Sequence, residues 1–224
     1  AKTLFPYTTL FRSMGIQIAD VAGGSLHALI GILSAVIERS QSGLGQHIDI
    51  SMTDCTAALN SMAAAAELAG KEQQHPEQSY LNGGALYDYY QTRDGRYLSV
   101  GSLEPQFMAG LAQLLDLPEV QEKGASLDAA DRKAVKQAIR EKIAGKDFAE
   151  WNAIFQAQDV CVEPVLTLHE ALHSELAAQR GWIAAVPLSA GSAETEPQPA
   201  CPIKFSRSKI RYEFIGKKLG FDHL

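Results

Sequence analysis

The feature that most constrains the fold of this chain is a run from Val21 to Arg39 in which almost every side chain is apolar or small. A helix of this composition has no broad polar face, so we expect it to be buried on most sides. Asp20 comes directly before the run, at the position of an N-cap, where its carboxylate can accept hydrogen bonds from the amides of Gly23 or Gly24. The same glycines would let a ligand approach the carboxylate closely. Both interpretations of Asp20, a structural cap and a functional acid, stay open at this point.

Composition indicates a globular chain whose main partner is not a nucleic acid. The net charge is −6, and no cluster of Lys and Arg is dense enough to neutralise a phosphate backbone. The three cysteines are far apart, which predicts neither a disulfide framework nor a zinc site and suits the cytoplasm. We expect no membrane span, because Val21 to Ile37 is short and contains Ser25, His27 and Ser34. No secretory signal is visible.

The beginning of the chain differs from the rest. The stretch Thr3 to Ser13 matches, residue for residue, the translation of a common sequencing-adapter oligonucleotide. We therefore exclude residues 1–13 from the fold as an artefact. On this interpretation the natural sequence begins at about Met14, and we expect a preceding part of the parent gene to be missing.

The pattern after the apolar run predicts a turn at Gly43 to Gly45, a half-buried strand from His47 to Met52, and a second helix to about Ala69 capped by Thr53 or Asp54. A polar connection follows. The Asp94-Gly95 pair between two aromatic and β-branched runs then predicts a hairpin. The other elements that we expect are helices at about Pro105–Leu115, Leu127–Ala144, Phe148–Gln158 and His169–Gln179, an extended Asp159–Leu168, a strand at Trp182–Pro187 and a polar loop at Ser189–Pro202.

Several ordered motifs carry a resemblance to a known family. These motifs are Asp20–Gly24, Glu38–Asp49, Asn82–Asp88, Asp94–Tyr97, Gly101–Phe107, Val162–Val165 and Lys204–Arg207. With them the chain resembles the family III CoA-transferases, also called the CaiB/BaiF type, and within that family the α-methylacyl-CoA racemases.

The resemblance implies an α/β fold class. The chain would be the C-terminal part of the family fold, with a partial Rossmann-type large domain and a small α+β domain. We expect residues 14–79 to belong to the large domain and its linking helix, residues 80–175 to form the small domain, and residues 176–224 to return to the large domain. The resemblance also implies an interlocked homodimer of the full-length parent.

The resemblance assigns catalysis to Asp20 and Glu104. Asp20 would exchange the α-proton of a 2-methylacyl-CoA thioester through an enolate, while a histidine serves the opposite face. That histidine would lie upstream of Asp20, and none of the six histidines of this chain matches it. Glu104 would orient the histidine, although an acid that precedes Pro105 at a helix start also has a purely structural explanation. We interpret His27 as a hydrogen-bonded structural residue.

The remaining site residues are predicted to bind the acyl-CoA. Gly83 and Gly84 would form a lid over the acyl chain, and Tyr87 and Asp88 would line the site, although a plain turn and sheet packing explain them equally well. No cofactor and no metal is expected, because the CoA thioester is itself the substrate.

Two other functions stay open. The first is CoA transfer between carboxylic acids, in which the same aspartate attacks the acyl thioester and an aspartyl-CoA intermediate forms. The second is that the chain is an inactive fragment of such an enzyme. In that case the apolar faces of the helix at Val21–Ile37 would be uncovered and prone to aggregation.

Overall fold

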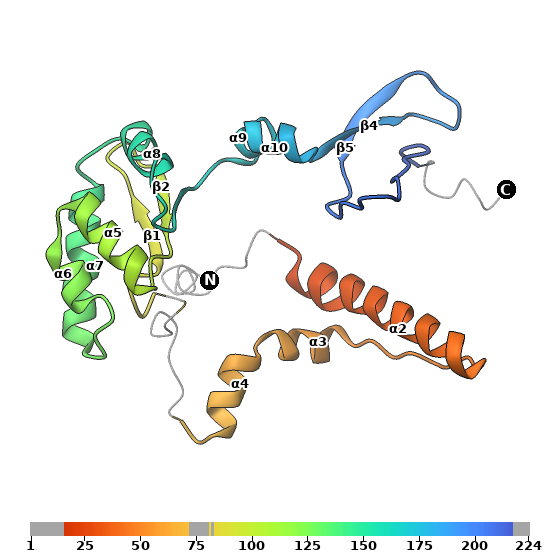
Figure 1. Ribbon diagram of the computed structural model, residues 1–224, viewed down its shortest axis with the longest axis horizontal. Helices are drawn as coiled ribbons and strands as arrows, with labels where there is room; N and C mark the ends of the chain where they lie inside the picture. Colours follow the sequence, from red (N-terminus) through yellow and green to blue (C-terminus); the bar gives the residue numbers. More distant parts are fainter. Residues whose placement is uncertain (1–15, 72–80, 82, 217–224) are drawn as a thin grey trace, which may run out of the picture. The chain divides into compact units, whose positions relative to one another are not determined.

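The computed structural model describes residues 16–71, 81 and 83–216 (Figure 1). Contacts divide the chain into two units, one from the N-terminus to Asp88 with Gly101–Ala138, and one of Tyr89–Val100 with the residues from Ile139 onward. The helices are η1 (Ile18–Leu26), α2 (His27–Ser42), α3 (Met52–Leu59), α4 (Ser61–Leu68), α5 (Pro105–Leu115), α6 (Pro118–Lys123), α7 (Ala129–Ile143), α8 (Phe148–Gln156), α9 (Leu168–Leu172) and α10 (Glu175–Arg180). The strands are β1 (Asp88–Gln91), β2 (Tyr97–Val100), β3 (Val162–Pro164), β4 (Ile183–Pro187) and β5 (Thr195–Pro199). The domain boundaries expected near residues 80 and 176 stay predictions.

The apolar run forms one continuous helix that starts with wide π-helical turns in η1 and goes on as the α-helix α2. It ends at Gly43, whose φ of 77° is left-handed and whose N–H donates to Arg39 O at 2.9 Å. Glycine adopts this conformation without steric cost, which explains why the helix stops there.

The prediction that this helix is buried is wrong for the described chain. Only Gly23 of the two helices is buried, and the exposed fraction of Val36 is 59% and that of Ile37 is 63%. The segment that packs on the helix, between Ile48 and Thr56, is too short to cover all of its sides. The prediction of uncovered apolar faces is therefore confirmed.

The same helix is also longer than expected. Ile18–Ser42 is 25 residues long and apolar enough to cross a membrane by length and composition, a test that core helices of soluble proteins also pass. Its length therefore gives no support to the expectation of no membrane span, which stays a prediction.

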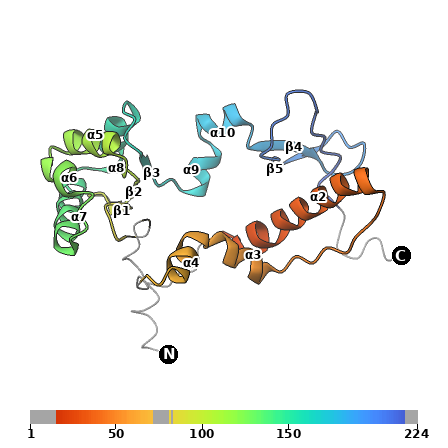
Figure 2. The same ribbon diagram turned by 60° about the horizontal axis from the view of Figure 1, so that its bottom comes forward.

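The segment that returns along α2 is extended, but it is not the predicted strand (Figure 2). Ile48 and Ile50 do share a face, and both contact α2 at Gly31, where an added Cβ would lie 3.2 Å from each side chain. The alternation was therefore interpreted correctly as one packed face. A strand also needs a backbone partner, and the structure pairs this segment with none among the described residues.

The second predicted helix is broken into α3 and α4 at Asn60. Its cap is Ser51, whose hydroxyl accepts from the Asp54 N–H at 3.3 Å, so the cap predicted at Thr53 or Asp54 is wrong by two or three residues. Asp54 lies instead in the first turn, where its negative charge interacts favourably with the positive end of the helix dipole.

In the rest of the first unit, α5 supplies several buried apolar side chains. This helix has the predicted bounds and buries Met108, Leu111, Ala112 and Leu115. The short helix α6, which was not predicted, packs against α5. At the end of α6, Gly124 lies so close to Met108 and Leu86 that an added Cβ would come within 2.9 Å of both side chains.

The second unit contains a three-stranded sheet in the order β1-β2-β3. The predicted hairpin is confirmed, and Gly95 in its turn has a φ of 80°. β3 lies within the predicted extended segment and pairs antiparallel with β2. The predicted third helix is confirmed as α8, although it ends two residues early.

Polar contacts join the hairpin turn to the start of α8. Arg93 Nε donates to Asp147 at 2.8 Å, and Asp94 accepts from the Phe148 N–H at 3.0 Å. The hydrogen bond from Arg93 holds the pKa of Asp147 below its usual range. Hydrogen bonding to the ionised form of Asp147 therefore stabilises this corner of the unit.

A proline-containing hairpin follows the helices α9 and α10. The predicted strand is confirmed as β4, but the segment expected to be a surface loop contains β5, which pairs antiparallel with β4. Pro197 and Pro199 of β5 lie opposite Ala185 and Ile183. Proline is tolerated there because both strands of a two-stranded sheet are edges.

Candidate active site

Asp20 is the third residue of η1, not its cap. The N-cap position is occupied by Gln17, so the predicted capping role is wrong. The side chain of Asp20 is exposed and makes no hydrogen bond to another described residue, while its backbone carbonyl accepts from Ser25 Oγ at 3.1 Å. A carboxylate in the first turn is favoured by the helix dipole, and this one is open to solvent and to a ligand.

The two glycines after Asp20 serve packing in the described chain. A Cβ added at Gly23 would lie 2.8 Å from Thr56 Oγ1 of α3, and one added at Gly24 would lie 3.3 Å from the Met52 side chain. The space that a ligand was predicted to use beside these glycines is therefore filled by α3. The small residues of η1 and α3 are the sequence signal for this packing, because they permit close approach of the two helices.

His27 has the structural role that was predicted. Its Nδ1 lies 2.6 Å from Ala22 O, five residues earlier, and the ring is partly buried. This contact spans the end of the π-helical turn, so His27 stabilises the junction of η1 with α2.

Glu104 occupies the N-cap position of α5, with Pro105 as the first helical residue. Its side chain is exposed and makes no capping hydrogen bond. Glu104 therefore has the predicted cap position, but its carboxylate does not cap the helix. No hydrogen bond or ion pair joins Glu104 to Asp20 in the part of the chain that the structure describes.

The structure brings two of the predicted acyl-binding residues together through a residue that was not predicted. Lys136 Nζ, on α7, lies 2.7 Å from Asp88 Oδ2 and also donates to the Gly83 carbonyl. Gly84 is partly buried next to Gly83, and Tyr87 is 39% exposed. The sequence offered only a weak signal for Lys136, a basic residue beside the buried Val135 of α7.

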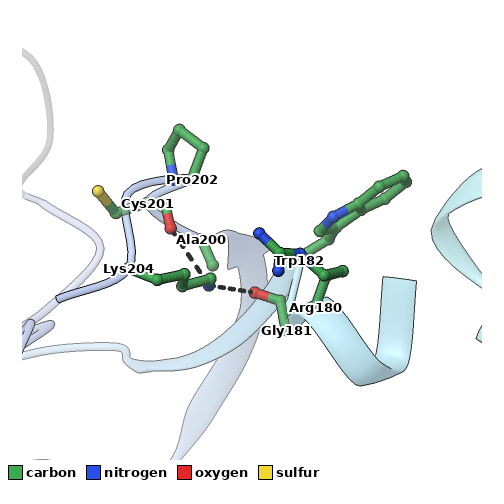
Figure 3. A pocket seen from close by; sticks show the side chains of 7 residues that line it. All are labelled: Arg180, Gly181, Trp182, Ala200, Cys201, Pro202 and Lys204. Carbon is green, nitrogen blue, oxygen red and sulfur yellow. Dashed lines mark hydrogen bonds between the residues drawn. The ribbon is translucent and has the colours of Figure 1, made fainter. Parts of the chain in front are cut away.

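A cavity of about 390 Å³ lies elsewhere, in the second unit, and the predicted site residues are not among those that line it. Lys204 Nζ lies between the carbonyls of Gly181, at 3.4 Å, and Cys201, at 3.5 Å (Figure 3). The cavity is lined by Arg180, Gly181, Trp182, Ala200, Cys201, Pro202 and Lys204.

Comparison with known proteins identifies the family. The α-methylacyl-CoA racemase of Mus musculus is 40% identical over 184 residues, which are 82% of this chain and 47% of the relative. The acetyl-CoA:oxalate CoA-transferase of Acetobacter aceti is 28% identical over 81% of this chain and 47% of the relative. The chain thus spans about half the length of these relatives.

A solved structure supports the predicted fold class. The CAIB/BAIF family protein from Brucella suis superposes with a TM-score of 0.68 over 93% of this chain and 54% of that chain, at 23% sequence identity. The chain therefore has part of the α/β fold of that type. The model of CoA-transferase family III matches residues 12–223. From this match over nearly the whole sequence, the chain belongs to CoA-transferase family III.

Proposed function

We propose that this family III acyl-CoA enzyme exchanges the α-proton of a 2-methylacyl-CoA, the racemase reaction, with Asp20 as a base. The observation that carries the proposal is the carboxylate of Asp20, which is exposed and has no side-chain hydrogen bond among the described residues. It lies in the motif that carries the resemblance to the racemases. The higher identity to the mouse racemase than to the oxalate transferase also supports this choice.

The chemistry needs one proton transfer in each direction. Asp20 takes the α-proton, and the electron pair of the C–H bond moves into the thioester carbonyl to give an enolate. Return of a solvent-exchanged proton by Asp20 to the same face gives exchange with retention. Inversion requires that the base on the opposite face, in its protonated form, donates a proton to the α-carbon, while Asp20 releases its proton to solvent. No cofactor is proposed, because the thioester carbonyl accepts the electron pair itself.

Glu104 is proposed as the second acid of the site. In this proposal it orients the base on the opposite face of the substrate, as the resemblance implies. Its exposed position at the start of α5 leaves the carboxylate open to such a partner.

The test is wash-in of deuterium at the α-carbon of (S)-2-methylbutanoyl-CoA in heavy water, followed by mass spectrometry. The wild-type chain is expected to incorporate deuterium, and Asp20→Asn to slow incorporation at least about 100-fold, the lower end for a general base. Asp54→Asn is the matched control, because Asp54 is also an exposed aspartate in the first turn of a helix. Equal incorporation by Asp20→Asn and the wild type would refute the assignment.

The similarity to a CoA-transferase supports a second candidate, transfer of CoA between carboxylic acids. In that reaction the Asp20 carboxylate attacks the thioester carbon and expels CoA thiolate, which then attacks the Asp20 carbonyl of the mixed anhydride, releases the donor carboxylate and forms aspartyl-CoA. The acceptor carboxylate displaces the thiolate from aspartyl-CoA to give a second anhydride, and the thiolate attacks its acceptor carbonyl to form the new thioester and free Asp20. CoA transfer that requires an added carboxylate, without deuterium wash-in, would favour this candidate. Absence of both activities would favour the inactive fragment.

A further inference from the structure

The turn that carries Gly83 and Gly84 is held by a nearly buried cation. Lys136 is only 11% exposed, and its Nζ lies 2.7 Å from Asp88 Oδ2, which belongs to a side chain that is 27% exposed. The same Nζ donates to the carbonyl of Gly83. One ammonium group therefore binds both ends of the segment Gly83–Asp88.

The middle of this segment is fixed independently by apolar packing. Ala85 and Leu86 are 0% and 1% exposed, and Leu86 packs beside Gly124. The Gly83 N–H donates to Tyr87 O at 3.3 Å, which closes the turn, and Gly83 has a φ of 78°. Because glycine at this φ has little conformational preference of its own, the contact with Lys136 is what selects the orientation of the Gly83 carbonyl.

We propose that Lys136 is a positioning residue that locks the Gly83–Gly84 turn and keeps Asp88 directed into the protein. Asp88 then anchors the turn and does not contact the acyl chain. The ammonium has three donors, and the two contacts here use two of them. Because Lys136 is nearly buried, removal of either charged partner leaves the other charge without compensation. The link of this turn to an acyl-CoA rests on the proposed function, whereas the lock itself does not.

Hydrogen exchange of the full chain, followed by mass spectrometry of peptides that cover Gly83–Tyr87, tests the lock. Lys136→Met keeps the length of the side chain and removes its charge, and we expect exchange in this segment to become about tenfold faster. Lys133→Met, on the same helix at an exposed position, is the matched control and should leave the rate unchanged. Lys136→Arg keeps the charge and the donors, so it should restore the rate to within about threefold of the wild type.

Two results would overturn the proposal: a wild-type exchange rate in Lys136→Met, or the same acceleration in Lys136→Met and Lys136→Arg, which would indicate packing alone. If Lys136→Met does not fold, as judged by circular dichroism, Asp88→Asn carries the test, because it removes the charge of the acceptor at constant size. It is expected to accelerate exchange about threefold, and an unchanged rate would contradict the lock.

A second arm separates the lock from the proposed function. Addition of 2-methylpropanoyl-CoA is expected to slow exchange of the Gly83–Tyr87 segment in the wild type and to have less effect in Lys136→Met. Absence of protection in the wild type would contradict the acyl-CoA lid, while the rates without ligand would still decide the lock.

Discussion

Substitution of Gly23 distinguishes between two uses of the glycines that follow Asp20, helix packing and ligand approach. An ideal Cβ at Gly23 lies 2.8 Å from Thr56 Oγ1 and 3.4 Å from Met52 O. The first distance is shorter than van der Waals contact permits, so either the side chain or the helix must move. Thr56 Oγ1 is itself buried and has no hydrogen-bond partner among the described residues.

The expected magnitude follows from two opposed effects. Overpacking a closely packed position costs about 1–3 kcal/mol, while replacing glycine by alanine within a helix gains about 1 kcal/mol. Gly23→Ala should therefore lower the free energy of unfolding by about 1 kcal/mol. With Thr56→Ala the nearest remaining atom is Met52 O at 3.4 Å. In that background Gly23→Ala should raise the free energy of unfolding by about 1 kcal/mol, a coupling of about 2 kcal/mol.

Urea unfolding followed by far-ultraviolet circular dichroism measures this coupling in the two single variants and the double variant. Gly45→Ala is the matched control, because an added Cβ there meets no atom within 4 Å. Effects that add to within about 0.5 kcal/mol would refute the contact between Gly23 and Thr56. A Gly23→Ala variant with unchanged stability but lost proton exchange would show instead that Gly23 makes room for a ligand.

Three further predictions concern other parts of the chain. Arg96→Lys replaces two hydrogen bonds to Glu170, at 2.9 and 3.0 Å, with a point charge and should lower Tm by about 4 °C in a thermal melt. Because Arg93 lowers the folded-state pKa of Asp147, the stabilisation is present above the ordinary carboxyl pKa and is lost as the pH falls through the lowered one. The urea concentration at the unfolding midpoint should therefore decrease when the pH is lowered below about 4. This decrease should be smaller in Arg93→Met, in which the partner of Asp147 is removed. Ile37→Lys, at a 63% exposed apolar position, should reduce light scattering by aggregates without loss of helicity.

The elements predicted correctly have their causes within a few neighbouring residues. The hairpin follows from Asp94-Gly95, since glycine alone adopts the φ of 80° of that turn at no cost. The start of α5 follows from Pro105 at the first helical position. α8 begins after Asp147, which forms a capping box with Glu150. The sequence is therefore sufficient to predict an element when turn or cap residues determine where it begins or ends.

The elements predicted wrongly depend on partners distant in sequence. The alternation of Ile48 and Ile50 indicates a packed face, which the structure has, but only a neighbouring strand would make that segment part of a sheet. β5 exists because β4 pairs with it, in spite of Pro197. In the candidate site, the contact of Lys136 with Asp88 spans 48 residues of sequence, as the numbering shows, and local patterns carry no information on it.

The exposure of Asp20 and of the apolar helix that follows it has a consequence for catalysis. A carboxylate that is solvated by water is a weak base toward an α-proton, because its hydration is lost as the proton is taken. Asp20 is exposed, and Ile32 and Leu33 of the same continuous helix are each 52% exposed. A surface that covered these side chains would also be placed to exclude water from the start of the helix. Under the proposed function, therefore, burial of α2 and activation of Asp20 should occur together.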